Sequence, residues 1–61
     1  MRALLRRIEA YLKATHTPPT RFGREAVRDP RFVFDLRNGR RPRGATVRRV
    51  SAFLDAREQQ A

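Results

Sequence analysis

Chain-breaking residues constrain the fold of this sequence more than any other feature. They stand at three places along the chain: Pro18-Pro19, Asp29-Pro30, and Asn38-Gly39 with Pro42 shortly after. Proline removes a backbone donor and clashes with the preceding helical turn, while asparagine and glycine favour the left-handed conformation that ends helices. The 61 residues are therefore divided into four short segments, and a core has to form between these segments.

Both outer segments predict amphipathic helices. The first, residues 3–14, carries apolar residues at helical spacing: Leu4, Leu5, Ile8, Tyr11 and Leu12. The last, residues 45–60, carries a second stripe and ends in a polar tail over about residues 56–61: Val47, Val50, Phe53 and Leu54. We expect this stripe to face Val33 and Leu36 of the third segment. No period-two alternation indicates a strand, so the sequence predicts an all-α, compact four-helix fold with one domain over residues 1–61.

The two inner segments predict shorter helices. Residues 20–27 form the second, with Thr17 as its N-cap or Thr20 as the alternative. Gly23 lies inside it at a cost of about 1 kcal/mol relative to alanine, so we expect another helix to approach closely there. The third helix is expected to begin at Pro30, with Asp29 as its N-cap, and to end at about Asn38.

The charge of the chain points to a polyanionic partner. Fifteen Lys and Arg stand against six Asp and Glu, which leaves a net charge of +9. Fourteen of the fifteen cations are Arg, the side chain that binds phosphates and guanine edges with two parallel hydrogen bonds. A GC-rich genome would also favour Arg over Lys, but it would not account for the net charge.

The sequence lacks the patterns typical of membrane-spanning, secreted, metal-binding and catalytic proteins. No apolar run approaches the roughly 18 residues of a membrane span, and the N-terminus lacks the apolar core of a signal peptide. We therefore expect a cytoplasmic protein. Met1 suggests a true start, and the polar tail suggests either a true end or a linker. His16 has no second ligand at metal-binding spacing, and the carboxylates form no catalytic motif. We therefore expect no metal, no cofactor and no enzyme activity.

The middle of the chain resembles a known family of DNA-binding domains. Apolar and small residues fall in the register of a helix-turn-helix: Phe22, Gly23, Ala26, Val33 and Leu36. The stretch Asn38-Gly39-Arg40-Arg41-Pro42 resembles the usual ending, and residues 46–50 resemble the following helix. Residues 18 to 54 are thus similar to the Xre superfamily, which includes phage lambda repressor and Cro. The resemblance implies a nucleoid-associated protein of a bacterium or phage. The chain departs from that superfamily in two ways: Val27 stands where the turn usually carries Gly, and Pro30, Phe32 and Phe34 stand where the recognition helix usually carries Gln, Ser or Thr.

This resemblance implies a helix-turn-helix over about residues 18–39, with residues 30–38 as the recognition helix in the major groove of DNA. Arg31 is expected to bind guanine and Phe34 to pack on a thymine methyl, although Phe34 could instead join Phe32 in the core. Asp35 would accept a hydrogen bond from the cytosine amino group or orient Arg31. Asn38 is the fourth residue expected to contact bases. The expected phosphate contacts are Thr20, Arg21, Arg28, Arg40, Arg41 and Arg43, with the minor groove as an alternative for Arg43.

The expected function is that of a sequence-specific regulator of transcription that binds double-stranded DNA as a homodimer, since one short helix reads few base pairs. One alternative is a non-specific nucleoid or architectural protein with the same fold. Another is a protein-interaction module, antitoxin-like or a phage accessory factor, that docks a protein partner. RNA binding and attachment to a membrane surface have weaker support in the sequence.

Overall fold

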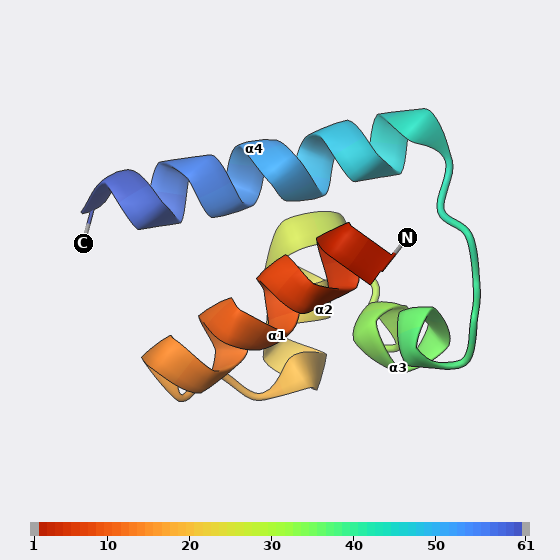
Figure 1. Cartoon of the computed structure of the whole chain (residues 1–61), viewed down its shortest axis with the longest axis horizontal. Coiled ribbons are helices and arrows are strands. Elements are labelled where there is room, and N and C mark those ends of the chain that lie inside the picture. Colours follow the sequence, from red (N-terminus) through yellow and green to blue (C-terminus); the bar gives the residue numbers. More distant parts are fainter. Residues whose placement is uncertain (1, 61) are drawn as a thin grey trace.

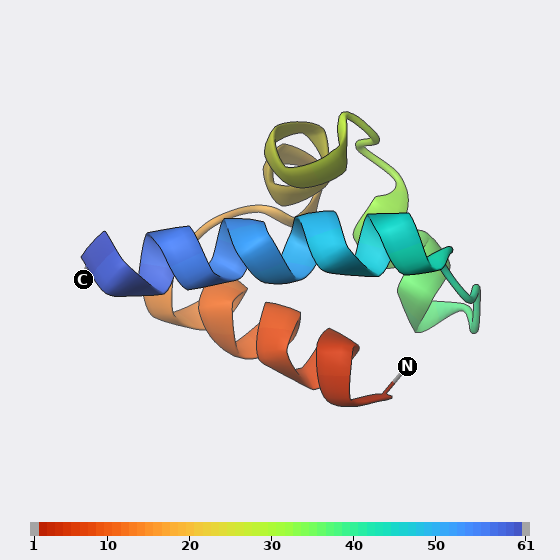
Figure 2. The same ribbon diagram turned by 90° about the horizontal axis from the view of Figure 1, so that it is seen from above.

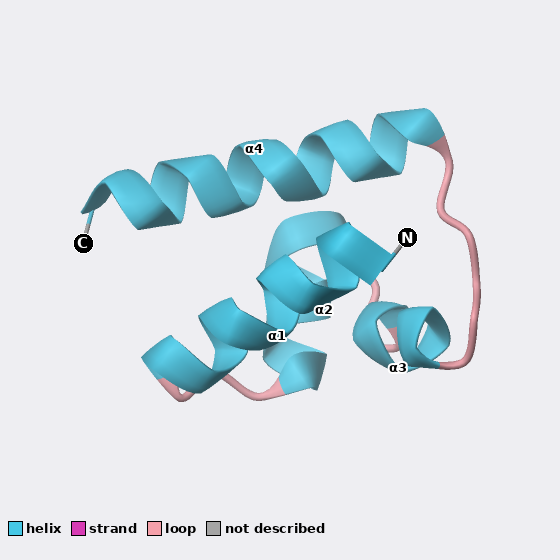
Figure 3. Cartoon of the chain, in the orientation of Figure 1, coloured by secondary structure: helices cyan, strands magenta, loops and turns pink. Residues whose placement is uncertain are grey.

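The computed structural model of the chain describes residues 2–60, and over that range it is helical without strands. Its four helices are α1 (Arg2–Thr15), α2 (Pro19–Val27), α3 (Phe32–Arg37) and α4 (Gly44–Gln60), as Figures 1 and 3 show. The predicted all-α, four-helix architecture is confirmed. The polar tail continues α4 to Gln60, while Met1 and Ala61 lie outside the described residues.

The longest helix, α4, lies across the other three. In the view from above, α1 and α2 flank it on opposite sides, and α3 lies at the end where α1 and α4 begin (Figure 2). Every helix contributes to one core: Leu4, Ile8, Leu12, Phe22, Ala26, Phe32, Val33, Leu36, Val50 and Leu54. An aromatic cluster joins α1, α2 and α4, with the Phe22 ring 5.7 Å from that of Tyr11 and 5.4 Å from that of Phe53 between centroids. The short helices are therefore held by tertiary contacts, as their length requires.

The start of α2 differs from the sequence prediction. Pro18 is the N-cap residue and Pro19 the first helical residue, without a capping side chain. Thr17 is not the cap, because its hydroxyl lies 2.7 Å from that of Thr15 in a hydrogen bond at the end of α1. Thr20 lies inside α2, so the alternative cap is also wrong. Two consecutive prolines fit this position because the first N–H groups of a helix have no intrahelical acceptor.

Helix α3 is shorter than predicted at both ends. The Asp29 carboxylate accepts a hydrogen bond from the Arg31 N–H at 3.0 Å, and the Asp29 carbonyl accepts one from the Phe32 N–H at 3.1 Å. Asp29 thus caps a turn that precedes the helix, and α3 begins at Phe32 instead of Pro30. At the other end, Gly39 alone is left-handed, with φ 94°, and the Arg40 N–H donates to the Asp35 carbonyl at 2.9 Å. This is a Schellman ending, and it turns the chain away from α3 at once.

Gly23 is required chiefly by the turn before α3, and α3 itself also approaches this position, as predicted. A Cβ atom at this position would lie 2.1 Å from the carbonyl oxygen of Asp29, in the turn between α2 and α3. The Asp29 N–H in turn donates to the Gly23 carbonyl at 3.0 Å. The backbone of the turn occupies the place of the missing side chain, and the Cβ of Phe32, in α3, lies 3.4 Å from the same place.

An ion pair joins α1 to α3. The Arg37 Nε and Nη2 groups donate to the two carboxylate oxygens of Glu9 at 2.8 and 2.7 Å. These hydrogen bonds lower the pKa of Glu9 and raise the pKa of Arg37. Both side chains are about 40% exposed, so solvent screens the pair.

Acidification is expected to break this pair. Because the pKa of Glu9 is lower in the folded chain than its ordinary value of 4.5, the pair stabilises the fold above pH 4.5 and is lost as the pH falls through the lower, folded value. We expect Glu9→Gln to lower the free energy of unfolding at pH 7 by up to about 1 kcal/mol. Thermal melts of both proteins between pH 7 and pH 2.5 check this, since the difference should vanish at the acid end. A difference that persists there would show that Glu9 stabilises the fold by packing instead of by charge.

Candidate nucleic-acid interface

Internal ion pairs divide the arginines into two groups. Within residues 2–60, each of the six carboxylates lies within 4.0 Å of a guanidinium nitrogen, and five arginines supply these partners: Arg7, Arg21, Arg37, Arg40 and Arg57. The other ten cations of this range have no carboxylate partner: Arg2, Arg6, Lys13, Arg24, Arg28, Arg31, Arg41, Arg43, Arg48 and Arg49. The acidic side chains are thus all paired with arginines of the same chain, and the excess positive charge is left exposed to solvent.

This excess is concentrated at one end of the molecule. Residues 28–49 contain eight Arg and two Asp, or +6 of the total +9, whereas residues 50–61 contain one Arg and two acidic residues, or −1. The basic stretch comprises the turn after α2, α3, the following loop and the first turns of α4, which lie together in Figure 1. On α1 and the last turns of α4, Arg7 donates to Asp55 and Glu58, and these hydrogen bonds raise its pKa. A polyanion is therefore attracted chiefly to the end that contains α3.

The four predicted base-reading residues have different environments. Arg31 is exposed, immediately before α3, without an acidic partner among the described residues. Phe34 is 41% exposed, and the Arg37 guanidinium lies 5.6 Å from its ring centroid. Asp35 accepts from Arg40 at 2.8 Å and not from Arg31, so the predicted pair between Asp35 and Arg31 is wrong. Asn38 is exposed at the end of α3.

The Phe34 side chain is exposed because the inner side of the short helix α3 is already occupied by other apolar residues. Phe32, Val33 and Leu36 occupy the inner side of this six-residue helix, with exposed fractions of 2%, 0% and 6%. A fourth apolar residue has no place there. Of the two environments that the sequence left open for Phe34, the structure shows the exposed one.

Three of the predicted phosphate-binding residues lie on α2 or in the turn that follows it. Thr20 and Arg21 are exposed in the first turn of α2, and the Arg21 Nε donates to Glu25 at 3.1 Å. Arg28 is exposed and left-handed, with φ 59°. Its side chain leaves the turn at the point where α2 ends.

The other three predicted phosphate-binding residues lie in the loop between α3 and α4 and are not equivalent. The Arg40 Nη1 lies 2.8 Å from Asp35 and 3.5 Å from Asp29, so this side chain joins the loop to α3 and to the turn before it. Arg41 and Arg43 are exposed and have no carboxylate within 4.0 Å among residues 2–60. Arg41 and Arg43 are therefore free to bind an external anion, whereas Arg40 holds the loop in place.

Comparison of the chain with protein-family models, curated proteins and solved structures found no match. The resemblance to the Xre superfamily therefore remains a prediction. In the turn between α2 and α3, Val27 stands at the position that the family usually fills with Gly, and it is helical and half-buried. The left-handed residue of this turn is Arg28, one position later.

Some features of this surface had no signal in the sequence. Arg2 and Arg41 are distant in the chain, yet both line one cavity, described below. Arg48 and Arg49 add two unpartnered cations to the first half of α4. In the part of the chain that the structure describes, no three His, Cys, Asp or Glu side chains gather as a metal site, and none of the helices is long and apolar enough to cross a membrane.

Proposed function

We propose that this protein binds double-stranded DNA in a sequence-specific manner and regulates transcription, with α2 and α3 acting as a helix-turn-helix. The single observation that carries the proposal is the concentration of unpartnered arginines around α3. Within residues 2–60, every Asp and Glu side chain is paired with an arginine of the same chain. Duplex DNA carries a dense row of phosphates, and neutralising them releases counterions and gives affinity without dependence on sequence.

Base reading in this proposal depends on the outward side of α3. Arg31 is exposed where the helix begins, and Phe34 offers an apolar surface that a thymine methyl can contact. Asp35 already accepts a hydrogen bond from Arg40. The better candidates for hydrogen bonds to base edges are therefore Arg31 and Asn38. The DNA phosphates on either side of α3 would be bound by Arg28, Arg41 and Arg43.

Selection from a randomised duplex library tests the proposal. A specific binder should prefer its best site to random DNA by about 10³-fold or more. Arg31→Ala should relax the preference at one position of that site by about 1–3 kcal/mol, while binding to random DNA weakens much less. A preference below about tenfold in the unaltered protein would instead identify a non-specific binder.

One observation favours that second candidate, a non-specific nucleoid protein. Unpartnered arginines also occur on α2 and α4, at Arg24, Arg48 and Arg49, and they extend the basic surface beyond the side of α3. A broad basic surface suits contacts to phosphates, which carry no sequence information. The library experiment decides between the two candidates.

A further inference from the structure

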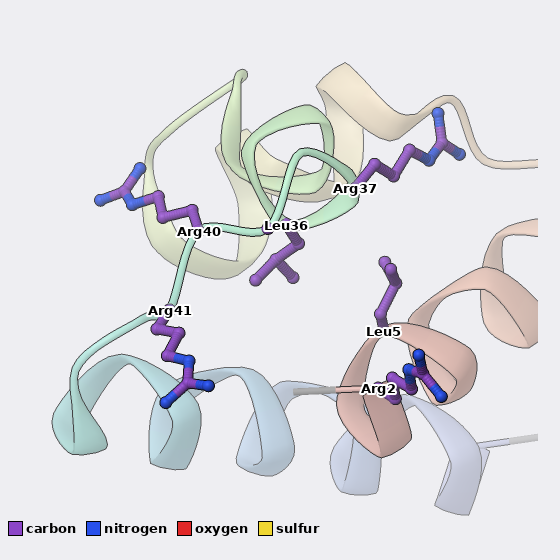
Figure 4. Close-up of a pocket in the computed structure, with 7 residues that line it drawn as sticks. Arg2, Leu5, Leu36, Arg37, Arg40 and Arg41 are labelled. Carbon is purple, nitrogen blue, oxygen red and sulfur yellow. The ribbon is translucent and has the colours of Figure 1, made fainter.

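A cavity of about 370 Å³ lies between the first turns of α1 and the end of α3 (Figure 4). Leu5 extends into it from α1 and Leu36 from α3, and Gly39 forms part of its wall. Leu36 is 6% exposed and Leu5 is half-buried, so the floor is apolar and continuous with the core. The left-handed Gly39 turns the chain sharply here and places the next two arginines beside the cavity.

The rim of this cavity is strongly basic. Arg2, Arg37, Arg40 and Arg41 line it, and none of the lining residues that the structure describes is acidic. Arg37 and Arg40 are held by carboxylates outside the lining, from Glu9 and from Asp29 and Asp35, so their positions are fixed. Arg2 and Arg41 have no carboxylate within 4.0 Å in the described range and retain all their donors for a ligand.

We propose that this cavity is a binding site for a sugar-phosphate unit. Arg2 and Arg41 would bind the phosphate, which guanidinium groups can do with two parallel hydrogen bonds each. Leu5 and Leu36 would pack against the carbon skeleton of the sugar, and their low polarity strengthens the charge interaction above them. The volume lies within the usual range for sites that hold small ligands.

The site lies beyond the proposed DNA-reading surface, because it uses α1 and the end of α3 instead of the outward side of α3. It shares Arg41 with the proposed phosphate contacts and differs from them in using Arg2 and the two leucines. A free nucleotide and the backbone of a DNA strand share the same sugar-phosphate chemistry, so both are sources of the ligand.

Titration of the ¹⁵N-labelled protein with deoxythymidine 5′-monophosphate at constant ionic strength tests this site, with thymidine as the phosphate-free control. We expect saturable shift changes confined to amides around Leu5, Leu36 and Gly39 for the nucleotide and none for thymidine. Arg2→Gln and Arg41→Gln should each weaken binding by at least about tenfold, because each removes charged hydrogen bonds to the phosphate. Lys13→Gln, an exposed change elsewhere on α1, should have no effect. Shifts spread over all exposed arginines, or affinity unchanged in Arg2→Gln and Arg41→Gln, would overturn the proposal.

A duplex competitor then identifies the source of the ligand. If backbone phosphates occupy the cavity, the duplex displaces the nucleotide, and Arg2→Gln lowers the log–log salt slope of duplex binding by about 0.9. If a free nucleotide is the occupant, Arg2→Gln weakens nucleotide binding and leaves the salt slope of duplex binding unchanged. If the duplex does not bind while the nucleotide does, the cavity site stands and the proposed DNA-binding function falls.

Discussion

Gly23→Ala is expected to cost most of the stability of this protein. The added Cβ would lie 2.1 Å from the Asp29 carbonyl oxygen, a backbone atom that can move only if the turn between α2 and α3 moves. Forcing extra volume into a packed site costs about 1–3 kcal/mol or more, and a chain of this length has only about 3–9 kcal/mol in total. We therefore expect the melting temperature, followed by circular dichroism at 222 nm, to fall by more than about 15 °C.

The other two glycines provide controls for this substitution. A Cβ at Gly44 would meet only the end of the Arg48 side chain, at 3.5 Å, so Gly44→Ala should change the free energy of unfolding by less than about 0.5 kcal/mol. Gly39 has no atom within 4 Å of the added Cβ but has φ 94°, so Gly39→Ala should cost about 1–2 kcal/mol through backbone conformation alone. If Gly23→Ala melted close to the unaltered protein, the contact between Gly23 and the Asp29 carbonyl would be wrong.

Much of the fold follows from local sequence signals. The Pro18-Pro19 pair, Pro30 and the Asn38-Gly39 step divide the chain into helices, and the apolar spacing identifies which residues are buried. The helix boundaries were less accurate because several polar groups compete locally. Thr17 bonds to Thr15 instead of capping α2, and Asp29 caps a preliminary turn instead of α3 itself.

The need for a glycine at position 23 illustrates a further limit of sequence reasoning. A glycine inside a helix indicates that a side chain would be unfavourable, but it does not identify the atom that excludes it. That atom, the Asp29 carbonyl, belongs to the turn six residues later, and its position depends on the left-handed Arg28. No residue-type preference predicts an arginine in that conformation.

The residue types of the candidate site could be predicted from the sequence, but the ion pairs between its arginines and the carboxylates could not. The density of arginines after α3 indicated an anionic partner, and the predicted cations are exposed. The sequence did not show that Arg40 is held by Asp35, or that Arg37 is held by Glu9, which lies 28 residues earlier. Such long-range pairs depend on how α1 and α3 pack, and they decide which arginines remain available to a ligand.

Removal of Arg41 and Arg43 is expected to have the largest effect on DNA binding. Each unpartnered arginine that neutralises one phosphate contributes about 0.9 to the log–log salt slope, so Arg41→Gln with Arg43→Gln should lower the slope by about 1.8. If affinities converge near 1 M salt, the loss at 0.1 M salt is roughly 60-fold. Fluorescence anisotropy with a labelled duplex between 0.05 and 0.4 M salt measures this.

A charge-matched control separates local contacts from net charge. Arg6→Gln with Lys13→Gln removes the same two charges from α1, which lies on the opposite side of α4 from α2 (Figure 2). These residues are also exposed and lack carboxylate partners in the structurally described range, so neither double variant should melt differently from the unaltered protein. Because Arg6 and Lys13 take no part in the proposed duplex interface around α3, the control should retain most of the original salt slope. Equal losses of slope in the two double variants would mean that the duplex responds to total charge, and the assignment of phosphate binding to the loop between α3 and α4 would then be wrong.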